Sequence, residues 1–354
     1  MTVTAAAASS PRRATPPALK RARGVLRFVG AVALTFFGLL LVTFLIGRVV
    51  PIDPVLAAVG DRAPQEVYLR VRSELGLDQP LYIQFYRYAA AVLHGDLGKS
   101  VLTSNPVLAD IKRFFPATFE LATLATLIGV LLGIPVGVLA AVRQNRWVDQ
   151  IIRVLGLLGY SVPVFWLGLM GLVLLYVHLG WVAGPGRLDV FYEDLVEPRT
   201  GVILLDSALA GDWTVFRNAF AHLILPASIL GYFSLAYVSR MTRSLMIEQL
   251  RQEYVVTARV KGLSEARVIW RHALGNVMVP LVTVVALSYA NLLEGSVLTE
   301  TVFAWPGIGQ YITNSLLNVD MNAVLGGTIV VGTVFVGLNL FSDLLYRALD
   351  PRAR

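Results

Sequence analysis

The sequence contains no cysteine and few charged residues. None of its 354 residues is Cys, and Asp, Glu, Lys and Arg make up only 15% of the chain, against roughly 25% in an average globular protein. The missing cysteine excludes a disulfide scaffold, thiolate metal ligands and a cysteine nucleophile. With 56% hydrophobic residues and a mean hydropathy of +0.67, the chain lacks the polar surface of a water-soluble body. The composition predicts a protein whose solvent is the lipid bilayer.

Patterns that carry catalysis or hold metals are also missing. The sequence has no HExxH motif, no histidine pair at the helical spacing of metal ligands and no Gly-x-Ser-x-Gly elbow. We therefore expect no catalytic residue, no metal site and no cofactor. The four histidines, which lie in separate segments, are His94, His178, His222 and His272.

Six apolar stretches are long enough to cross a membrane. A spanning helix needs about 20 mostly apolar residues, because each residue rises about 1.5 Å and the hydrocarbon core is about 30 Å thick. None of the six contains Asp, Glu, Lys or Arg. The sequence therefore predicts an all-α integral membrane protein with six transmembrane helices. They are Phe28–Gly47, Leu121–Val142, Val154–Val177, Leu223–Ser239, Ala273–Leu293 and Met321–Ser342.

Basic residues gather on one side of these spans. The segments up to Arg27, 143–153, 240–272 and after Ser342 hold 19 of the 30 Lys and Arg residues but 6 of the 23 Asp and Glu residues. Because cytoplasmic loops are enriched in Lys and Arg, we expect these segments, and hence both termini, to be cytoplasmic. The formal net charge of +7 is then a topology signal, and no nucleic-acid partner is expected.

The spans divide the chain into four expected regions. The long outer segment after the first span is expected to be partly helical, with helices ending at Gly76 and Gly95. The regions are a disordered basic cytoplasmic tail (1–27), the first transmembrane helix with a long extracytoplasmic insertion (28–113), a transmembrane domain of five helices (114–346) and a short cytoplasmic tail (347–354).

The inner segment 240–276 has the pattern of two helices joined by a bend. Residues Ser244 to Lys261 have an apolar face of period 3.6, and Gly262 supplies a C-terminal stop. Ser264 is placed to cap a second helix, with Glu265 near its positive end. The pattern predicts a bent element that could fit a groove on a cytoplasmic partner. Its expected apolar face consists of Met246, Ile247, Leu250, Tyr254, Thr257 and Ala258.

The run 253–264, continued by 271–276 and Pro280, resembles the cytoplasmic EAA-type loop of bacterial ABC importer permeases. It is most similar to the B-type permease of the dipeptide and oligopeptide (peptide/nickel) family. The order and spacing of several further motifs extend the resemblance along nearly the whole chain. These are 75–78 with Pro80, 95–98 with Ser100, 116–121, Glu300 to Gly309, Asp320, 343–346 and 350–352.

The resemblance implies a type I ABC importer permease in the bacterial cytoplasmic membrane, forming half of a pathway for di- or oligopeptides. It implies four protein partners: a second, related permease subunit, two cytoplasmic ATP-binding subunits that hydrolyse ATP, and an extracytoplasmic solute-binding protein. Substrate-binding residues cannot be selected from the sequence. The resemblance implies that the ATPase-coupling loop uses Glu253, Tyr254, Thr257, Ala258, Arg259, Lys261, Gly262, Leu263, Arg271 and His272.

Other functions are compatible with parts of this pattern. The same architecture could import nickel chelates, glutathione or another small solute. An ion-coupled carrier usually places ionisable residues inside the bilayer, whereas Glu120, Glu294 and Asp343 stand at span ends, where we expect interfacial anchors. Trp305 is likewise expected in a turn at the outer membrane interface. A structural membrane scaffold is a third class.

Overall fold

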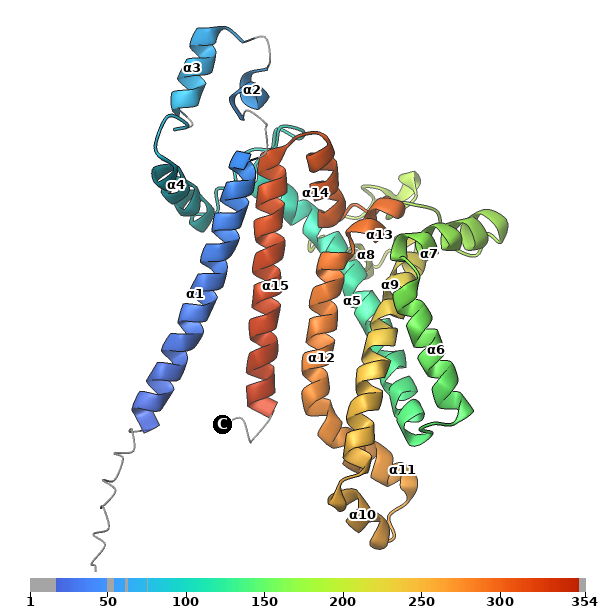
Figure 1. Ribbon diagram of the computed structural model, residues 1–354. Helices are drawn as coiled ribbons and strands as arrows, with labels where there is room; N and C mark the ends of the chain where they lie inside the picture. The colour runs from blue at the N-terminus through green and yellow to red at the C-terminus, as the bar shows by residue number, and fades with distance from the viewer. Residues whose placement is uncertain (1–16, 50–53, 61–62, 75, 350–354) are drawn as a thin grey trace, which may run out of the picture.

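The computed structural model describes residues 17–49, 54–60, 63–74 and 76–349, and these residues are almost entirely helical. Long helices stand side by side, with short helices at both ends of the bundle (Figure 1). The long helices are α1 (Pro17–Val49), α5 (Val107–Val142), α6 (Trp147–Ser161), α9 (Trp213–Leu250), α12 (Leu274–Gly295) and α15 (Met321–Leu349).

Five apolar helical segments within the described residues are long enough to span a membrane, which confirms five of the six predicted spans. They are longer than expected, because the polar residues that flank each apolar run continue the helix. The segments are Phe28–Arg48, Val107–Val142, Trp213–Leu250, Glu265–Gly295 and Met321–Leu345.

The expected third span, Val154–Val177, is wrong as a single straight helix. The chain bends by 97° between α6 and the following helical segment, which comprises α7 (Val164–Gly171) and the π-helix η1 (Leu172–His178). Pro163 lies at the bend. It has no N–H to donate and it disfavours helical geometry at the preceding residue. Val162 accordingly has extended backbone angles, φ −93° and ψ 127°. The apolar run therefore turns sideways (Figure 1), and α7 packs against α9 and α13.

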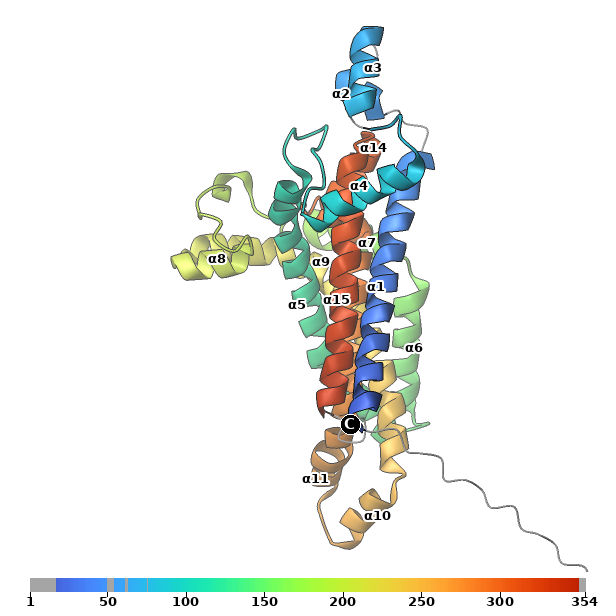
Figure 2. The same cartoon turned by 90° about the vertical axis from the view of Figure 1, so that its left-hand side faces the viewer.

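The expected terminal tails are shorter than the sequence indicated. Helix α1 begins at Pro17, so residues 17–27 extend the first span instead of forming a disordered tail. Residues 1–16 and 350–354 lie outside the described residues. Helix α15 continues to Leu349. The start of α1 and the end of α15 lie at the same end of the bundle as the inner helices α10 (Glu253–Val260) and α11 (Glu265–Arg267) (Figures 1 and 2).

The centre of the bundle is the contact between α5 and α9. Gly133 and Gly137 of α5 allow this close approach. A Cβ atom on Gly137 would lie 2.6 Å from the carbonyl oxygen of Ser239, and one on Gly133 would lie 3.1 Å from Cβ of Val238. Ala and Leu side chains of the two helices continue the buried core. These glycines therefore pack helices within one subunit.

The other end of the bundle carries the insertion and a set of short helices. Gly76 and Gly95 follow α3 and α4 with positive φ values of 65° and 82°, as predicted. Phe85 of α4 packs edge-on against Phe37 and Phe44 of α1. The short helices here are α2 (Pro54–Val59), α3 (Gln65–Glu74), α4 (Leu81–Leu93), the 3₁₀ turn η2 (Val190–Tyr192), α8 (Ile203–Ala210), α13 (Val297–Val302) and α14 (Ile308–Leu317).

Candidate functional site

The bent inner element projects beyond the bundle between α9 and α12 (Figure 1). Helix α9 ends at Leu250, and α10 begins at Glu253. The prediction of one continuous helix from Ser244 to Lys261 is therefore wrong. Gln252 breaks it with extended backbone angles, φ −75° and ψ 148°. The break separates a short helix of eight residues from the membrane-spanning helix.

The bend after α10 is a Schellman motif. Gly262 has a left-handed φ of 76°. Its N–H donates to the carbonyl of Arg259 at 2.9 Å, and the N–H of Leu263 donates to the carbonyl of Ala258 at 3.2 Å. These are the two hydrogen bonds that define the motif. Gly262 thus ends the helix as the sequence predicts.

A small apolar core holds the two arms of the bend together. Val255 and Ala258 of α10 pack with Leu263 and with Val268, the first residue of the π-helix η3 (Val268–Ala273). The predicted apolar face placed Tyr254 and Thr257 inward, but both are exposed. The break at Gln252 restarts the helix and shifts the inward face by one residue.

Polar contacts close the same bend from outside. The guanidinium of Arg259 pairs with the carboxylate of Glu265, with Nε to Oε1 at 2.8 Å. Ser264 occupies the N-cap position as predicted, but its side chain makes no capping hydrogen bond. Arg259 therefore braces the bend, so it is less free to bind a partner than the sequence suggested.

The expected coupling residues divide into an inner and an outer group. Ala258 is buried and Leu263 is half-buried against the small core, whereas His272 is half-buried on η3. Sequence reasoning missed three exposed apolar residues on the same element: Val256, Trp270 and Val260, which is 82% exposed. Apolar side chains exposed beyond the end of the spans were the signal that could have found them. The exposed members of the predicted set are Glu253, Tyr254, Thr257, Arg259, Lys261, Gly262 and Arg271.

A buried ion pair fixes the helix that leads into this element. Asp149, at the start of α6, is fully buried and accepts two hydrogen bonds from Arg243 of α9, from Nε at 2.6 Å and from Nη2 at 2.7 Å. The backbone N–H of Asn145 donates to the same carboxylate at 2.9 Å. A bidentate pair of this kind fixes relative orientation. The inner ends of α6 and α9 are thereby joined.

At the opposite end, Glu300 is a fully buried carboxylate. It accepts hydrogen bonds from the hydroxyls of Thr118 at 2.6 Å and Ser296 at 2.9 Å, and from the N–H of Gln310 at 2.9 Å. Burial raises the pKa of Glu300, and the hydrogen bond from Thr118 is the largest of the opposing effects. Glu300 thus joins α5, α13 and α14.

Two expected interfacial anchors on this side are buried instead. Trp305 is fully buried, and its Nε1–H donates to the carbonyl of Ala117 at 2.9 Å. Glu120 is buried on α5, where it pairs with Arg187 and accepts a hydrogen bond from the N–H of Leu204 at 2.9 Å. The loop after η1 supplies these partners, which are more than 60 residues away in the sequence.

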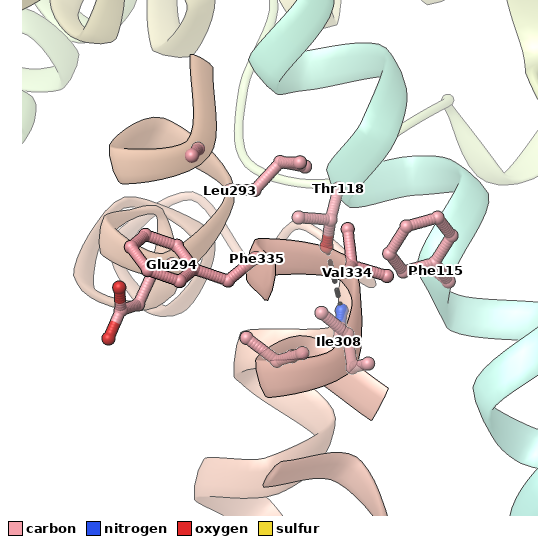
Figure 3. A pocket seen from close by; sticks show the side chains of 9 residues that line it. Phe115, Thr118, Leu293, Glu294, Ile308, Val334 and Phe335 are labelled. Carbon is pink, nitrogen blue, oxygen red and sulfur yellow. Dashed lines mark hydrogen bonds between the residues drawn. The ribbon is translucent and has the colours of Figure 1, made fainter. Parts of the chain in front are cut away.

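The exposed side of α12 carries a line of polar residues. Asn276, Asn291 and Glu294 are exposed, whereas Thr283 is half-buried and its hydroxyl oxygen is buried. At 100° per residue all four lie within about 80° of one another around the helix. Glu294 directs its carboxylate away from the apolar side chains of the adjoining pocket (Figure 3). Within the described residues, Asn276, Asn291 and Glu294 show no side-chain hydrogen bond or ion pair. We call these four residues the α12 track.

Comparison with known protein families identifies the family of this chain. Residues 133–354 match the family model described as the binding-protein-dependent transport system inner membrane component. Residues 22–122 match the model for the N-terminal part of such membrane components. The chain belongs to this family. The expectation of an importer permease in the inner membrane, crossing it several times, is confirmed.

Individual relatives match this permease over most of both chains. It is 47% identical over 318 residues to the probable D,D-dipeptide transport system permease protein of Escherichia coli (strain K12), covering 89% of this chain and 92% of that one. It is 42% identical over 331 residues to the di/tripeptide transport system permease protein of Pseudomonas aeruginosa (strain UCBPP-PA14), covering 93% and 98%.

A solved structure confirms the all-α permease fold. The match is to an inward-facing conformation of the MetNI methionine ABC transporter, with a TM-score of 0.51 and 18% identity, covering 70% of this permease and 100% of that chain.

Proposed function

We propose that this permease is one of two related membrane subunits of an ATP-driven importer of di- or oligopeptides. The observation that carries the proposal is the near full-length match to relatives named as dipeptide and di/tripeptide permeases. Family membership disfavours an ion-coupled carrier working alone. The Lys and Arg distribution supports a cytoplasmic position for both termini and for α10.

Uptake into sealed vesicles that contain the whole transporter tests the function. We expect accumulation of labelled dipeptide that requires ATP and persists when an uncoupler collapses the proton gradient. Loss of uptake with the gradient would indicate an ion-coupled carrier. Uptake of a nickel chelate or glutathione, but not of dipeptides, would indicate an importer of the same architecture with a different substrate.

The element α10–η3 is the proposed contact with the two ATP-binding subunits. Its small core and its Arg259–Glu265 pair hold it as a unit, and it connects α9 to α12. Such a unit can pass on movement only if it binds the open and closed ATPase dimers with different affinity. Its exposed apolar side chains, among them Val260 and Trp270, are suited to a protein groove.

Replacing Val260 with Asp, or Lys261 with Glu, is expected to weaken ATPase association about tenfold in pull-downs, because each change places a carboxylate at the proposed contact. Reversing the charge of Arg259 alone should also weaken ATPase association, because it breaks the ion pair with Glu265. The double variant Arg259→Glu with Glu265→Arg restores the pair and should recover association. Failure of this rescue would make Arg259 a direct ATPase contact.

The second permease subunit is proposed to cover the sideways segment after the 97° bend. This segment and the turn after it expose large apolar side chains, including Trp166, Leu174 and, in the turn, Trp181, which is 74% exposed. An apolar surface of this kind marks a protein contact or a lipid contact. The solute-binding protein is proposed to dock on the outer end, where the insertion and α8 project.

The α12 track is proposed to line the peptide pathway. Polar residues in a membrane helix usually face a bundle interior or a water-filled cavity, and Glu294 borders a cavity of about 340 Å³ between α12, α14 and α15. Glu294, at the outer end, is placed to attract the ammonium group of an entering peptide. The exposed members of the track supply hydrogen-bonding groups at the two ends of α12, with Asn276 at the inner end and Asn291 and Glu294 toward the outer end.

Glu294→Gln is expected to lower uptake of a dipeptide with a free amino group about threefold to tenfold, because the attraction between opposite charges is lost. Uptake of the same dipeptide with an acetylated amino group should change little. Asp343→Gln, a change at the inner end of α15, is the matched control. Equal effects of Glu294→Gln on both peptides would remove Glu294 from the pathway.

A further inference from the structure

A cavity of about 250 Å³ lies between α6 and α9, on the side of the bundle toward α10. Each helix contributes residues at helical spacings of three and four, so two helical faces form its walls. The α6 face supplies Ile152, Arg153, Gly156, Leu157 and Tyr160, and the α9 face supplies Ala236, Ser239, Arg240 and Arg243.

The cavity exists because small residues occupy the middle of both walls. Gly156 on α6 and Ala236 and Ser239 on α9 are among its lining residues. A Cβ atom built on Gly156 would meet nothing within 4 Å, so the space beside it is open and not filled by a neighbouring chain segment. A larger side chain at this position would enter the cavity without disturbing the helix contact.

The walls carry an excess of positive charge. Arg243 is neutralised by its bidentate pair with the buried Asp149. Arg240 lies over the ring of Tyr160, with its guanidinium carbon 4.8 Å from the ring centroid. Neither Arg153 nor Arg240 forms an ion pair within the described part of the chain. Arg153 attracts Asp149 through space, but two guanidinium groups border the cavity without a direct ion-pair partner.

Stacking on an aromatic ring fixes a guanidinium and leaves its edge N–H groups free to donate. Arginine donates two parallel hydrogen bonds to one carboxylate or phosphate group, and this pair is about twice as strong as neutral hydrogen bonds. Ile152 and Leu157 add apolar surface beside these donors. The site therefore fits an anionic oxygen group attached to a small or extended apolar body.

We propose that this cavity is an anion-binding site in which Arg153 and Arg240 hold a single carboxylate or phosphate group. The carboxylate source is the C-terminal group of a peptide leaving the pathway. The phosphate source is an anionic phospholipid of the inner leaflet, since basic pockets between membrane helices on the cytoplasmic side suit lipid headgroups. The carboxylate source rests on the proposed import of peptides, whereas the phospholipid source does not.

The full-length chain, purified in nanodiscs with its associated subunits, allows both sources to be tested. The first probe is dialanine against dialanine amide, whose binding is measured by calorimetry. The second is phosphatidylglycerol against phosphatidylcholine, whose retention is measured by native mass spectrometry. The variants are Arg153→Gln with Arg240→Gln, and separately Gly156→Leu, which fills the cavity and keeps both charges. Arg146→Gln, at the N-cap of α6 and outside the cavity, is the matched control.

We expect dialanine to be preferred over its amide, or phosphatidylglycerol over phosphatidylcholine, about tenfold or more. That preference should disappear in the double arginine variant and in Gly156→Leu, and it should persist in Arg146→Gln. Both arginine changes leave the Asp149–Arg243 pair intact, and a thermal melt checks that the variants fold. A preference for dialanine identifies the peptide source, and one for phosphatidylglycerol identifies the lipid source. Equal binding of the two members in both probe pairs, or an unchanged preference in both cavity variants, would overturn the proposal.

Discussion

Replacing Gly262 with proline is expected to reduce ATP-driven uptake at least tenfold while leaving the chain in the membrane. Proline fixes φ near −65° and has no N–H, but Gly262 has φ 76° and donates to the carbonyl of Arg259. The Schellman motif cannot form, so α10 would lose its attachment to η3. The membrane spans lie outside this bend, and their insertion should be unchanged.

Gly262→Ala is the matched control for this prediction. A Cβ atom at Gly262 would meet nothing within 4 Å, so alanine adds only the cost of a left-handed backbone, about 1–2 kcal/mol. It also keeps the N–H. Uptake by the alanine variant should stay within about threefold of the unchanged permease. Full uptake by a normally inserted proline variant would show that the bend does not transmit force to the spans.

Uptake and ATP hydrolysis should be measured together on the proline variant. If α10 serves only to hold the ATPase in place, both rates fall in parallel with ATPase binding. If the bend transmits movement, the ATPase remains partly bound and hydrolyses ATP without uptake. The ratio of transported peptide to hydrolysed ATP distinguishes adhesion from coupling, and we expect this ratio to fall.

The sequence predicts local features of this permease well. Apolar length predicts five spans, and the glycines at 76, 95 and 262 mark helix ends, because a left-handed residue is required there. The bend at Pro163 was missed. Proline is common in membrane helices, and Pro135, Pro226 and Pro280 lie within continuous helices. Whether a proline breaks a helix depends on neighbours that satisfy the freed carbonyls, and the sequence does not specify them.

The inner face of α10 shows a second limit of sequence reasoning. The period of 3.6 was counted through Gln252, where the helix stops and restarts. A one-residue change of phase then exchanges Tyr254 for Val255 as the buried residue. The exposure of Val260 on α10 and of Trp270 on η3 follows from the bend between these two helices, which the helical period alone does not describe. The sequence thus predicts that a helix forms, but not which of its faces points inward after a break.

Long-range burial is the third limit, and Glu300 is the clearest case. Its partner Thr118 is 182 residues away in the sequence, so no local pattern could indicate that the carboxylate is buried. The same contact explains the glycines that follow. A Cβ atom on Gly307 would overlap the carboxylate of Glu300, and one on Gly309 would lie 2.9 Å from its Oε2. The motif from Glu300 to Gly309 is therefore a loop folded around one carboxylate.

Glu300→Ala is expected to destabilise the permease by about 3–5 kcal/mol. The change leaves the buried hydroxyls of Thr118 and Ser296 and the N–H of Gln310 without their acceptor, and an unsatisfied buried donor costs roughly 1–3 kcal/mol. Glu300→Gln keeps the shape but turns an NH₂ group toward one set of donors, so a smaller loss of about 1–3 kcal/mol is expected. Thermal unfolding in detergent, followed by the loss of helical signal, measures both.

Gly307→Ala provides a double-mutant cycle with Glu300. In the unchanged permease the added methyl group overlaps the Glu300 carboxylate and should cost about 1–3 kcal/mol through overpacking. In the Glu300→Ala background the overlap is gone, so the same methyl group should cost much less. Gly275→Ala, where a Cβ atom meets nothing within 4 Å, controls for a methyl group at an unrelated helical glycine. Strictly additive losses in the cycle would mean that Gly307 is required for another reason than the buried carboxylate.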